Sequence, residues 1–89
     1  MEFEWNEEKC KANRVKHGID FDVTADFDWS LAWTKEDKRL DYGEPRYISI
    51  GPIRGRLHIM VWTLRGDVVR IINFRKANRR EVRDYVSQT

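Results

Sequence analysis

Basic side chains gather in two short stretches of this 89-residue chain, and each stretch contains the tetrapeptide KANR. In the first, "EEKCKANRVKHG", Lys9, Asn13 and Lys16 follow one another at spacings of four and three residues, and His17 comes next. Residues spaced in this way share one face of a helix. This face would offer ammonium groups, an amide and an imidazole to a phosphate, and a solvated basic stripe is the plain alternative.

The second stretch, "RKANRREVRDY", sets several cations around an expected helix start. Asn78 and Glu81 have the spacing of a capping box, so the helix should begin at Asn78. Cations are unfavourable at this end of a helix, whereas its unpaired N–H groups attract anions, so a bound phosphate would turn repulsion into attraction. Incidental surface charge is the alternative. The cations are Arg75, Lys76, Arg79 and Arg80.

The two copies of KANR therefore occupy different places, one inside a helix and one across a helix start, and are not a repeat. Two further arginines belong to an expected hairpin, Arg65 at its turn and Arg70 in the returning strand. An unpaired charge on a buried face is costly, so Arg70 should meet a carboxylate or lie where that face opens. Strict alternation places Arg75 on the opposite face, so these arginines converge only if the strand ends splay.

Several other kinds of site lack their sequence patterns. There is no CxxC, no HExxH and no glycine-rich phosphate loop. Cys10 has no evident partner for nucleophilic catalysis, and His58 is typical of a structural strand residue. The aspartates between residues 20 and 28 are too spread to select an ion. We therefore expect neither a metal nor any other cofactor.

Length and composition favour a single domain over residues 1–89. The chain is 36% charged and 40% hydrophobic, which suits a solvated surface around a thin core rather than disorder. One cysteine permits no internal disulfide, and no apolar run approaches a membrane span, so we expect a cytoplasmic protein. The net charge of +2 conceals seven basic and three acidic residues after residue 64, where a polyanion would bind first.

Hydrophobic periodicity and capping signals predict the elements that must position these side chains. A strand is expected at residues 3–5, then a helix from Asn6 to about His17 that Gly18 ends. Residues 21–27 fit either a half-buried strand or a helix. The other predicted elements are an edge strand at 31–34, a strand at 46–51, a turn at 52–55, a central strand at 56–64, its hairpin partner at 68–74 and a helix from Asn78.

Four of these segments together resemble the BrnT-type ribonuclease toxins of bacterial toxin–antitoxin pairs. They are "FEWNEEKCKANRVKHGIDF", "RYISIG", "TLRGDVVRII" and "RKANRREVRDY", and the resemblance spans nearly the whole chain. It implies an α+β fold similar to RelE-type toxins, with a small antiparallel sheet, N-terminal helices and a C-terminal helix, and it favours a helix at residues 21–27. The chain departs from the family at Asn6, where Asp is usual, and at Asn73 and Phe74, where small residues are usual.

The resemblance implies RNA cleavage, and a set of Lys, His, Arg and Tyr side chains can perform it without a metal ion. RNA supplies its own 2′-OH nucleophile, so cleavage needs a base, a proton donor and cations on the transition state. The expected catalytic residues are Lys9, His17, Arg65, Arg75, Glu81 and Tyr85. The expected RNA- or phosphate-binding residues are Asn13, Lys16, Arg70, Lys76, Arg79 and Arg80.

The resemblance also implies a protein partner. This is an antitoxin with a ribbon-helix-helix DNA-binding domain, through which the complex would bind its own operator DNA. The alternative hypothesis is an inactive toxin-like subunit that mainly holds the antitoxin on the operator. Cations at a helix start favour the enzyme, because a pure partner-binding subunit has little use for them.

Overall fold

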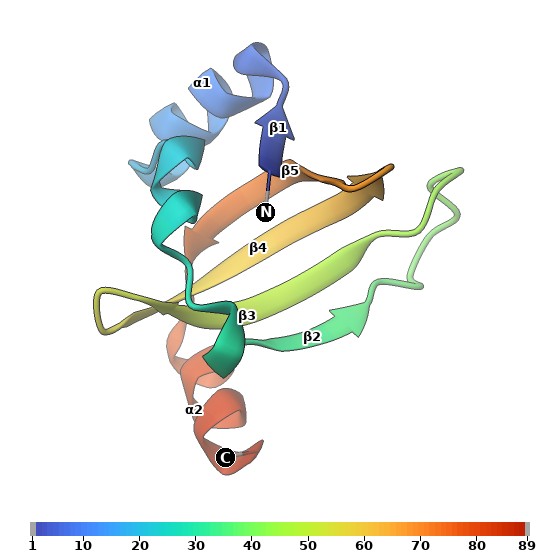
Figure 1. Cartoon of the computed structure of the whole chain (residues 1–89). Coiled ribbons are helices and arrows are strands. Elements are labelled where there is room, and N and C mark those ends of the chain that lie inside the picture. The colour runs from blue at the N-terminus through green and yellow to red at the C-terminus, as the bar shows by residue number, and fades with distance from the viewer. Residues whose placement is uncertain (1, 89) are drawn as a thin grey trace.

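The computed structural model describes residues 2–88, which form one five-stranded sheet and two α-helices (Figure 1). The strands are β1 (Glu2–Trp5), β2 (Trp33–Glu36), β3 (Tyr47–Ile53), β4 (Arg56–Arg65) and β5 (Val68–Lys76). The helices are α1 (Glu7–His17) and α2 (Arg79–Gln88), with two short 3-10 helices, η1 (Phe21–Asp26) and η2 (Trp29–Leu31), between α1 and β2. Neither α-helix of the described residues has the length and apolar character needed to span a membrane.

The sheet has the strand order β1-β5-β4-β3-β2 and is mixed. The strands β2 to β5 pair antiparallel, whereas β1 pairs with β5 in parallel, with Trp5 opposite Ile71. The α+β class is confirmed, but the expected purely antiparallel sheet is wrong. Most of the chain separates β1 from β5, so no hairpin turn forces the two strands to run in opposite directions.

Local sequence signals determine both ends of α1. The Asn6 side-chain oxygen accepts hydrogen bonds from the backbone N–H groups of Glu8 and Lys9, at 2.9 and 3.1 Å. Gly18 ends the helix with a φ of 71°, a left-handed conformation that glycine adopts without strain. The predicted helix boundaries are confirmed, and the Asn that replaces the usual Asp at position 6 still caps.

Three predictions between residues 21 and 55 need correction or refinement. Residues 21–26 are helical in η1, which is a 3-10 helix, and Phe27 is extended; Phe21 and Thr24, three apart in η1, are both buried. The edge strand begins at Trp33 rather than at residue 31, because η2 occupies the residues before it. The turn before β4 is only Arg54-Gly55, where both residues have positive φ, as in a two-residue hairpin.

A β-bulge in β5 decides which way its later side chains point. Val61 of β4 lies opposite Asn73, but the next residue, Trp62, lies opposite Ile71. Ile72 therefore has no partner residue of its own, and the alternation of side chains along β5 shifts by one at this point.

This shift places Arg75 on the same face of the sheet as Arg70. Directly opposite residues of paired strands point to the same face, and Arg70 and Arg75 lie opposite Thr63 and Ile59, two residues of β4 with the same parity. The prediction that Arg70 and Arg75 occupy opposite faces is wrong. The same shift sends Phe74 into the core.

One face of the sheet, here called the covered face, carries the main hydrophobic core. α1 contributes Cys10 to it, the segment from residue 18 to residue 28 contributes Ile19, Phe21 and Phe27, and the strands contribute Ile53, Met60, Ile71 and Phe74. The other face, here called the open face, packs against α2 in a smaller cluster of Ile50, Ile59 and Ala77, with Val82 and Tyr85 alongside. Figure 1 shows α1 and α2 on opposite sides of the sheet. α2 is the only α-helix of the described residues that packs on the open face, and it covers one end of that face.

The Asn13 side chain joins α1 to β5. Its amide nitrogen donates to the carbonyl oxygens of Phe74 at 2.6 Å and Ile19 at 3.1 Å, and its oxygen accepts from the Phe74 N–H at 3.2 Å. Asn13 is 5% exposed. The amide of Asn13 is therefore used inside the protein, although Asn13 also lines a hollow with Lys9 and Lys16, and its role in RNA binding stays a prediction.

Replacing Asn13 by Ala would leave three buried backbone groups without partners. We expect Asn13→Ala to lower the free energy of unfolding by about 2–4 kcal/mol, because each unsatisfied buried group costs on the order of 1–3 kcal/mol. The matched control is Lys11→Ala, an exposed residue of the same helix, which should change it by less than about 0.5 kcal/mol. Urea unfolding followed by circular dichroism measures both, and equal midpoints for the two variants would contradict the assignment.

Candidate functional site

The open face and α2 enclose a groove with a volume of about 300 Å³. Its floor is apolar, and its walls carry most of the charge. The floor residues are Ile48, Ile50, Ile59 and Val61. The wall residues are Trp33 and Lys35 of β2, Arg39 of the following loop, Arg75 of β5, and Arg80, Glu81 and Asp84 of α2. Four cations against two carboxylates leave the groove positive, which suits an anionic ligand.

The strand register orders the groove residues in two parallel rows. The first row is Trp33, Ile50, Ile59 and Arg75, and the second is Lys35, Ile48, Val61 and Asn73. Neighbouring strands lie about 4.8 Å apart, so the backbones of Trp33 and Arg75, at the ends of the first row, are separated by about 14 Å. Each row has an apolar centre and a polar or aromatic residue at either end.

Arg75 and Glu81 form the strongest polar pair of the groove. The Arg75 guanidinium donates to both Glu81 carboxylate oxygens, at 2.7 and 2.8 Å. Glu81 also completes the predicted capping box: its carboxylate accepts from the Asn78 N–H at 2.9 Å, and the Asn78 side chain accepts from the Glu81 N–H at 2.8 Å. The predicted helix start is confirmed, and the pair attaches it to β5.

This arrangement keeps Glu81 ionised. The hydrogen bonds from Arg75 lower the pKa of the Glu81 carboxyl below its ordinary value, and the Asn78 N–H contributes in the same direction. Glu81 therefore offsets part of the Arg75 charge and fixes the direction of its guanidinium.

His17 lies at the end of α1, close enough to Arg75 for the two charges to interact. Burial lowers the pKa of its imidazole first, and the positive charges of Lys16 and Arg75 lower it further. His17 is therefore neutral at pH 7, with a ring nitrogen able to accept a proton.

The lysines of α1 line a second, smaller hollow of about 180 Å³. Lys9 and Lys16 lie around it, with Ile72 and Asn73 of β5 on the other side. Asn73 also ends the second row of the open face, and its backbone lies about 7 Å along β5 from that of Arg75, which lines the groove. The structure thus brings the α1 lysines near Arg75 without placing them in the same groove.

Other predicted residues lie outside the groove. Arg79 lines a separate hollow with Arg56 and Arg83. Lys76 lies opposite His58, hence on the covered face, and is exposed. Arg65 faces Glu44 at 3.6 Å, near the hairpin end of the sheet.

Arg70 meets a carboxylate, as expected. It lies 3.4 Å from Glu4 of β1, its parallel neighbour in the sheet. The Tyr85 hydroxyl donates to the Leu31 carbonyl oxygen at 2.6 Å, so it holds α2 against the segment before β2. Phe74, one of the two departures from the family pattern at 73–74, is buried on the covered face and does not enter the groove.

Four wall residues of the groove are absent from the sequence-based prediction, namely Trp33, Lys35, Arg39 and Asp84. The signal for the first two is the alternation of Trp33 and Lys35 on one face of an edge strand. No sequence pattern indicates Arg39, because a contact within the loop positions it. Asp37, whose side chain is 2% exposed, accepts two hydrogen bonds of 2.8 Å from the Arg39 guanidinium.

Cys10 and His58, which the sequence analysis does not place in the site, are both buried. Cys10 is buried, and burial raises the pKa of its thiol. His58 is buried, stacks on Phe74 with ring centroids 5.3 Å apart, and makes a 2.7 Å hydrogen bond to the Arg56 carbonyl through Nδ1. Among residues 2–88 no group of three or more His, Cys, Asp or Glu side chains forms a possible metal site.

The Arg75–Glu81 pair makes a pH-dependent contribution to stability. Because the pKa of Glu81 is depressed in the folded protein, this contribution is present above the ordinary value of 4.5 and is lost as the pH falls below it. Glu81→Gln keeps the cap but removes the charge, so we expect it to lower the free energy of unfolding by about 1 kcal/mol at pH 7.

The difference in the free energy of unfolding between wild type and Glu81→Gln should become smaller when urea unfolding is measured at pH values below 4.5, because the wild-type carboxylate becomes protonated as the pH falls. Glu2→Gln, at an exposed residue of β1, is the control and should show no such trend. A difference for Glu81→Gln that is constant from pH 7 to pH 3 would contradict the ion pair.

A search of curated proteins found no match to the chain. A family model does match residues 5–81, and its description is ribonuclease toxin, BrnT, of type II toxin–antitoxin system. The match includes α1, the strands β2 to β5 and the Arg75–Glu81 pair. The chain therefore belongs to the BrnT family of ribonuclease toxins of type II toxin–antitoxin systems.

Proposed function

We propose that this chain is a metal-independent endoribonuclease and that the groove on the open face binds the RNA backbone. The observation that carries the proposal is the convergence of Arg75, Arg80 and Lys35 on one apolar-floored groove. These cations come from β5, α2 and β2, so only the folded chain brings them together. His17, a neutral proton acceptor, lies outside the lining of the groove, at the end of α1, where the charge of Arg75 still affects its pKa.

The proposed reaction uses the RNA's own nucleophile. His17 takes the proton of a 2′-OH, whose oxygen then attacks the adjacent phosphorus and expels the 5′-oxygen of the next nucleotide. A water molecule supplies the proton that the leaving oxygen takes up, and the His17 imidazolium returns its proton to solvent. The products are a 2′,3′-cyclic phosphate and a 5′-hydroxyl. The phosphorane-like transition state carries extra negative charge, which cations fixed in advance stabilise.

Arg75 is the residue best placed for this stabilisation. Glu81 holds its guanidinium in one orientation, so little reorganisation is needed when charge develops on the phosphate. Arg80 lies in the first turn of α2, where it adds charge to the same groove. Lys9 and Lys16 would continue the RNA path along α1, past Asn73.

The family membership extends this proposal to partners. We infer that a ribbon-helix-helix antitoxin neutralises the chain in the cytoplasm and carries the complex to operator DNA. We also infer that the described fold is a RelE-like arrangement in one toxin-like domain. The rival is the inactive subunit that only binds the antitoxin, and the groove charges favour the enzyme over it.

Inducible expression of the chain alone separates the two hypotheses. We expect growth arrest with loss of cellular RNA, and cutting of RNA by the purified protein in excess EDTA, with cyclic phosphate ends. Arg75→Ala should lower the cutting rate by about 100-fold or more, because one fixed cation on the transition state is worth on the order of 3 kcal/mol. Harmless accumulation of the wild type would favour the antitoxin-binding subunit.

Two variants of α2 supply a matched comparison. Arg80 lines the groove, whereas Arg83, on the same helix, lines the separate hollow with Arg79. Arg80→Ala should lower RNA cutting by about 10-fold, and Arg83→Ala should leave it within about 2-fold. Equal losses would show that overall charge, rather than the groove, accounts for the activity.

The pH dependence of cutting tests His17. A protonated imidazole cannot accept the 2′-OH proton, so kcat/KM should fall as the pH drops, with a half-maximal point below 6.5, because the pKa of His17 is lowered. His17→Gln should lower kcat/KM by about 100-fold and remove this acid limb. An unchanged acid limb in His17→Gln would assign the base to another group.

A further inference from the structure

Trp33 differs from the other three tryptophans of the chain. Trp5, Trp29 and Trp62 each contact another aromatic ring, with centroids 4.8 to 6.4 Å apart. Within residues 2–88, Trp33 has no ring contact and no hydrogen-bond acceptor for its indole N–H, and it is 43% exposed. Single exposed apolar residues are common on protein surfaces, so the surroundings of this ring must decide whether it binds a ligand.

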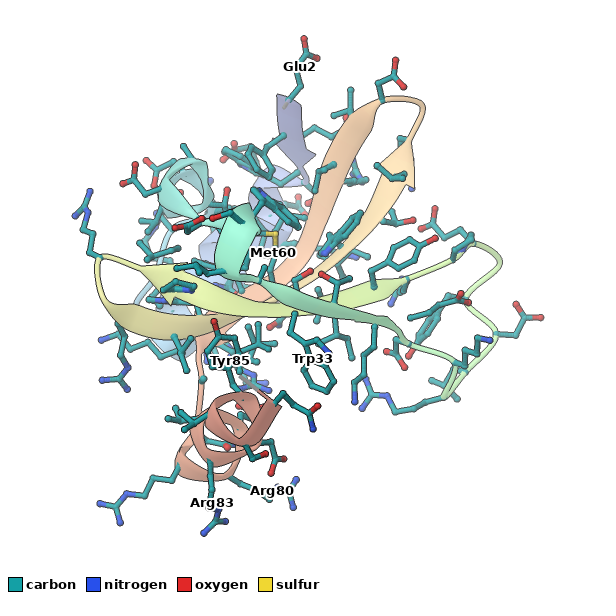
Figure 2. The ribbon with its side chains drawn as sticks, turned by 60° about the horizontal axis from the view of Figure 1, so that its bottom comes forward. Glu2, Trp33, Met60, Arg80, Arg83 and Tyr85 are labelled. Carbon is teal, nitrogen blue, oxygen red and sulfur yellow. The ribbon has the colours of Figure 1, made fainter. Side chains whose placement is uncertain are left out.

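The position of Trp33 points to a ligand. It lines the groove at the end of the first row, opposite Ile50. Figure 2 shows its ring on the α2 side of the sheet, together with Tyr85, while Met60 lies on the other side. The exposed ring thus faces the same space as the groove cations.

Two cations flank this ring. Lys35 is on the same face of β2, two residues along the strand. Arg39 follows in the loop, where Asp37 fixes the guanidinium through two hydrogen bonds and Tyr42 donates a third to the same carboxylate at 3.0 Å. Arg39 still exposes 76% of its side chain, so it remains accessible to an anion.

We propose that Trp33 is a stacking platform for one base of single-stranded RNA, with Lys35 and Arg39 binding the neighbouring phosphate. This subsite rests on the proposed ribonuclease function. An exposed aromatic ring beside fixed cations is how proteins commonly hold single strands, because every base has a face to stack and every linkage has a charge. An acidic peptide would match the two cations, and a neutral apolar peptide would match the ring. Neither would match the ring and the cations together.

The subsite lies apart from the proposed cutting site. Trp33 and Arg75 occupy opposite ends of one cross-strand row, about 14 Å apart at the backbone. The stacked base therefore belongs to a different nucleotide from the one whose phosphate meets Arg75. Loss of the ring should weaken RNA binding and raise KM, while kcat stays within about 2-fold.

The test uses a fluorescein-labelled single-stranded RNA of about 12 nucleotides with 2′-O-methyl sugars, which cannot be cut because the nucleophile is blocked. Fluorescence anisotropy should show that Trp33→Ala and Trp33→Leu bind about 10-fold more weakly than wild type, whereas Trp33→Phe, which keeps a ring, stays within about 3-fold. Leu64→Ala, at an exposed apolar residue outside the groove, is the control and should bind as wild type does.

A second probe of the same length has abasic sugars throughout. It should bind wild type and Trp33→Ala equally, because no base remains to stack. Equal binding of the base-containing probe by wild type and Trp33→Leu would overturn the subsite, as would a Trp33→Ala defect that persists with the abasic probe. Cutting of unmodified RNA by the wild type is measured in parallel, so failure of the subsite is distinguished from failure of the nuclease.

Discussion

The side chain of Asn13 fixes the strand on which the site is built. β1 pairs with β5 only as far as Ile71, and beyond that point the edge of β5 has no neighbouring strand among the described residues. Asn13 takes the place of that strand by binding both the N–H and the carbonyl of Phe74. With Phe74 held in the core, the next residue, Arg75, must point to the open face.

From this constraint follows the electrostatic character of the groove. Arg75 reaches Glu81, Glu81 caps α2, and α2 then brings Arg80 over the apolar floor of β3 and β4. The positive charge of Arg75 also reaches His17 at the end of α1, where it helps to keep the imidazole neutral. β5 thus positions Arg75 within electrostatic range of His17 on α1 and in the same groove as the cations of α2 and β2.

Local features of the fold could be predicted from the sequence, whereas features that depend on distant contacts could not. The Asn6 and Gly18 caps and the Asn78–Glu81 box involve neighbours within a few residues, and all three are present. The bulge at Ile72 has no glycine or other local signature, so simple alternation gave the wrong face for Arg75. The burial of Asn13 has no local sequence signal either, because its hydrogen-bond partner Phe74 lies 61 residues away in the sequence.

The same distinction between local and distant contacts explains why only part of the site could be predicted from the sequence. Arg75, Arg80 and Glu81 belong to one continuous stretch, and they do share the groove. Trp33, Lys35 and Arg39 enter it only because β2 pairs with β3 and because Asp37 positions the loop. These contacts join segments whose sequences carry no common motif.

The central claim is that RNA binds to the open face of the sheet around Arg75. The most direct test is nuclear magnetic resonance of the arginine Nε–H and tryptophan Nε1–H groups during titration with an uncleavable 2′-O-methyl RNA. Signals of Arg75, Arg80 and Trp33 should shift together and saturate at one concentration, while those of Trp5 and Trp62, packed in aromatic contacts, should stay in place. Shifts confined to Arg79 and Arg83, with Arg75 unchanged, would place the RNA elsewhere and contradict the account.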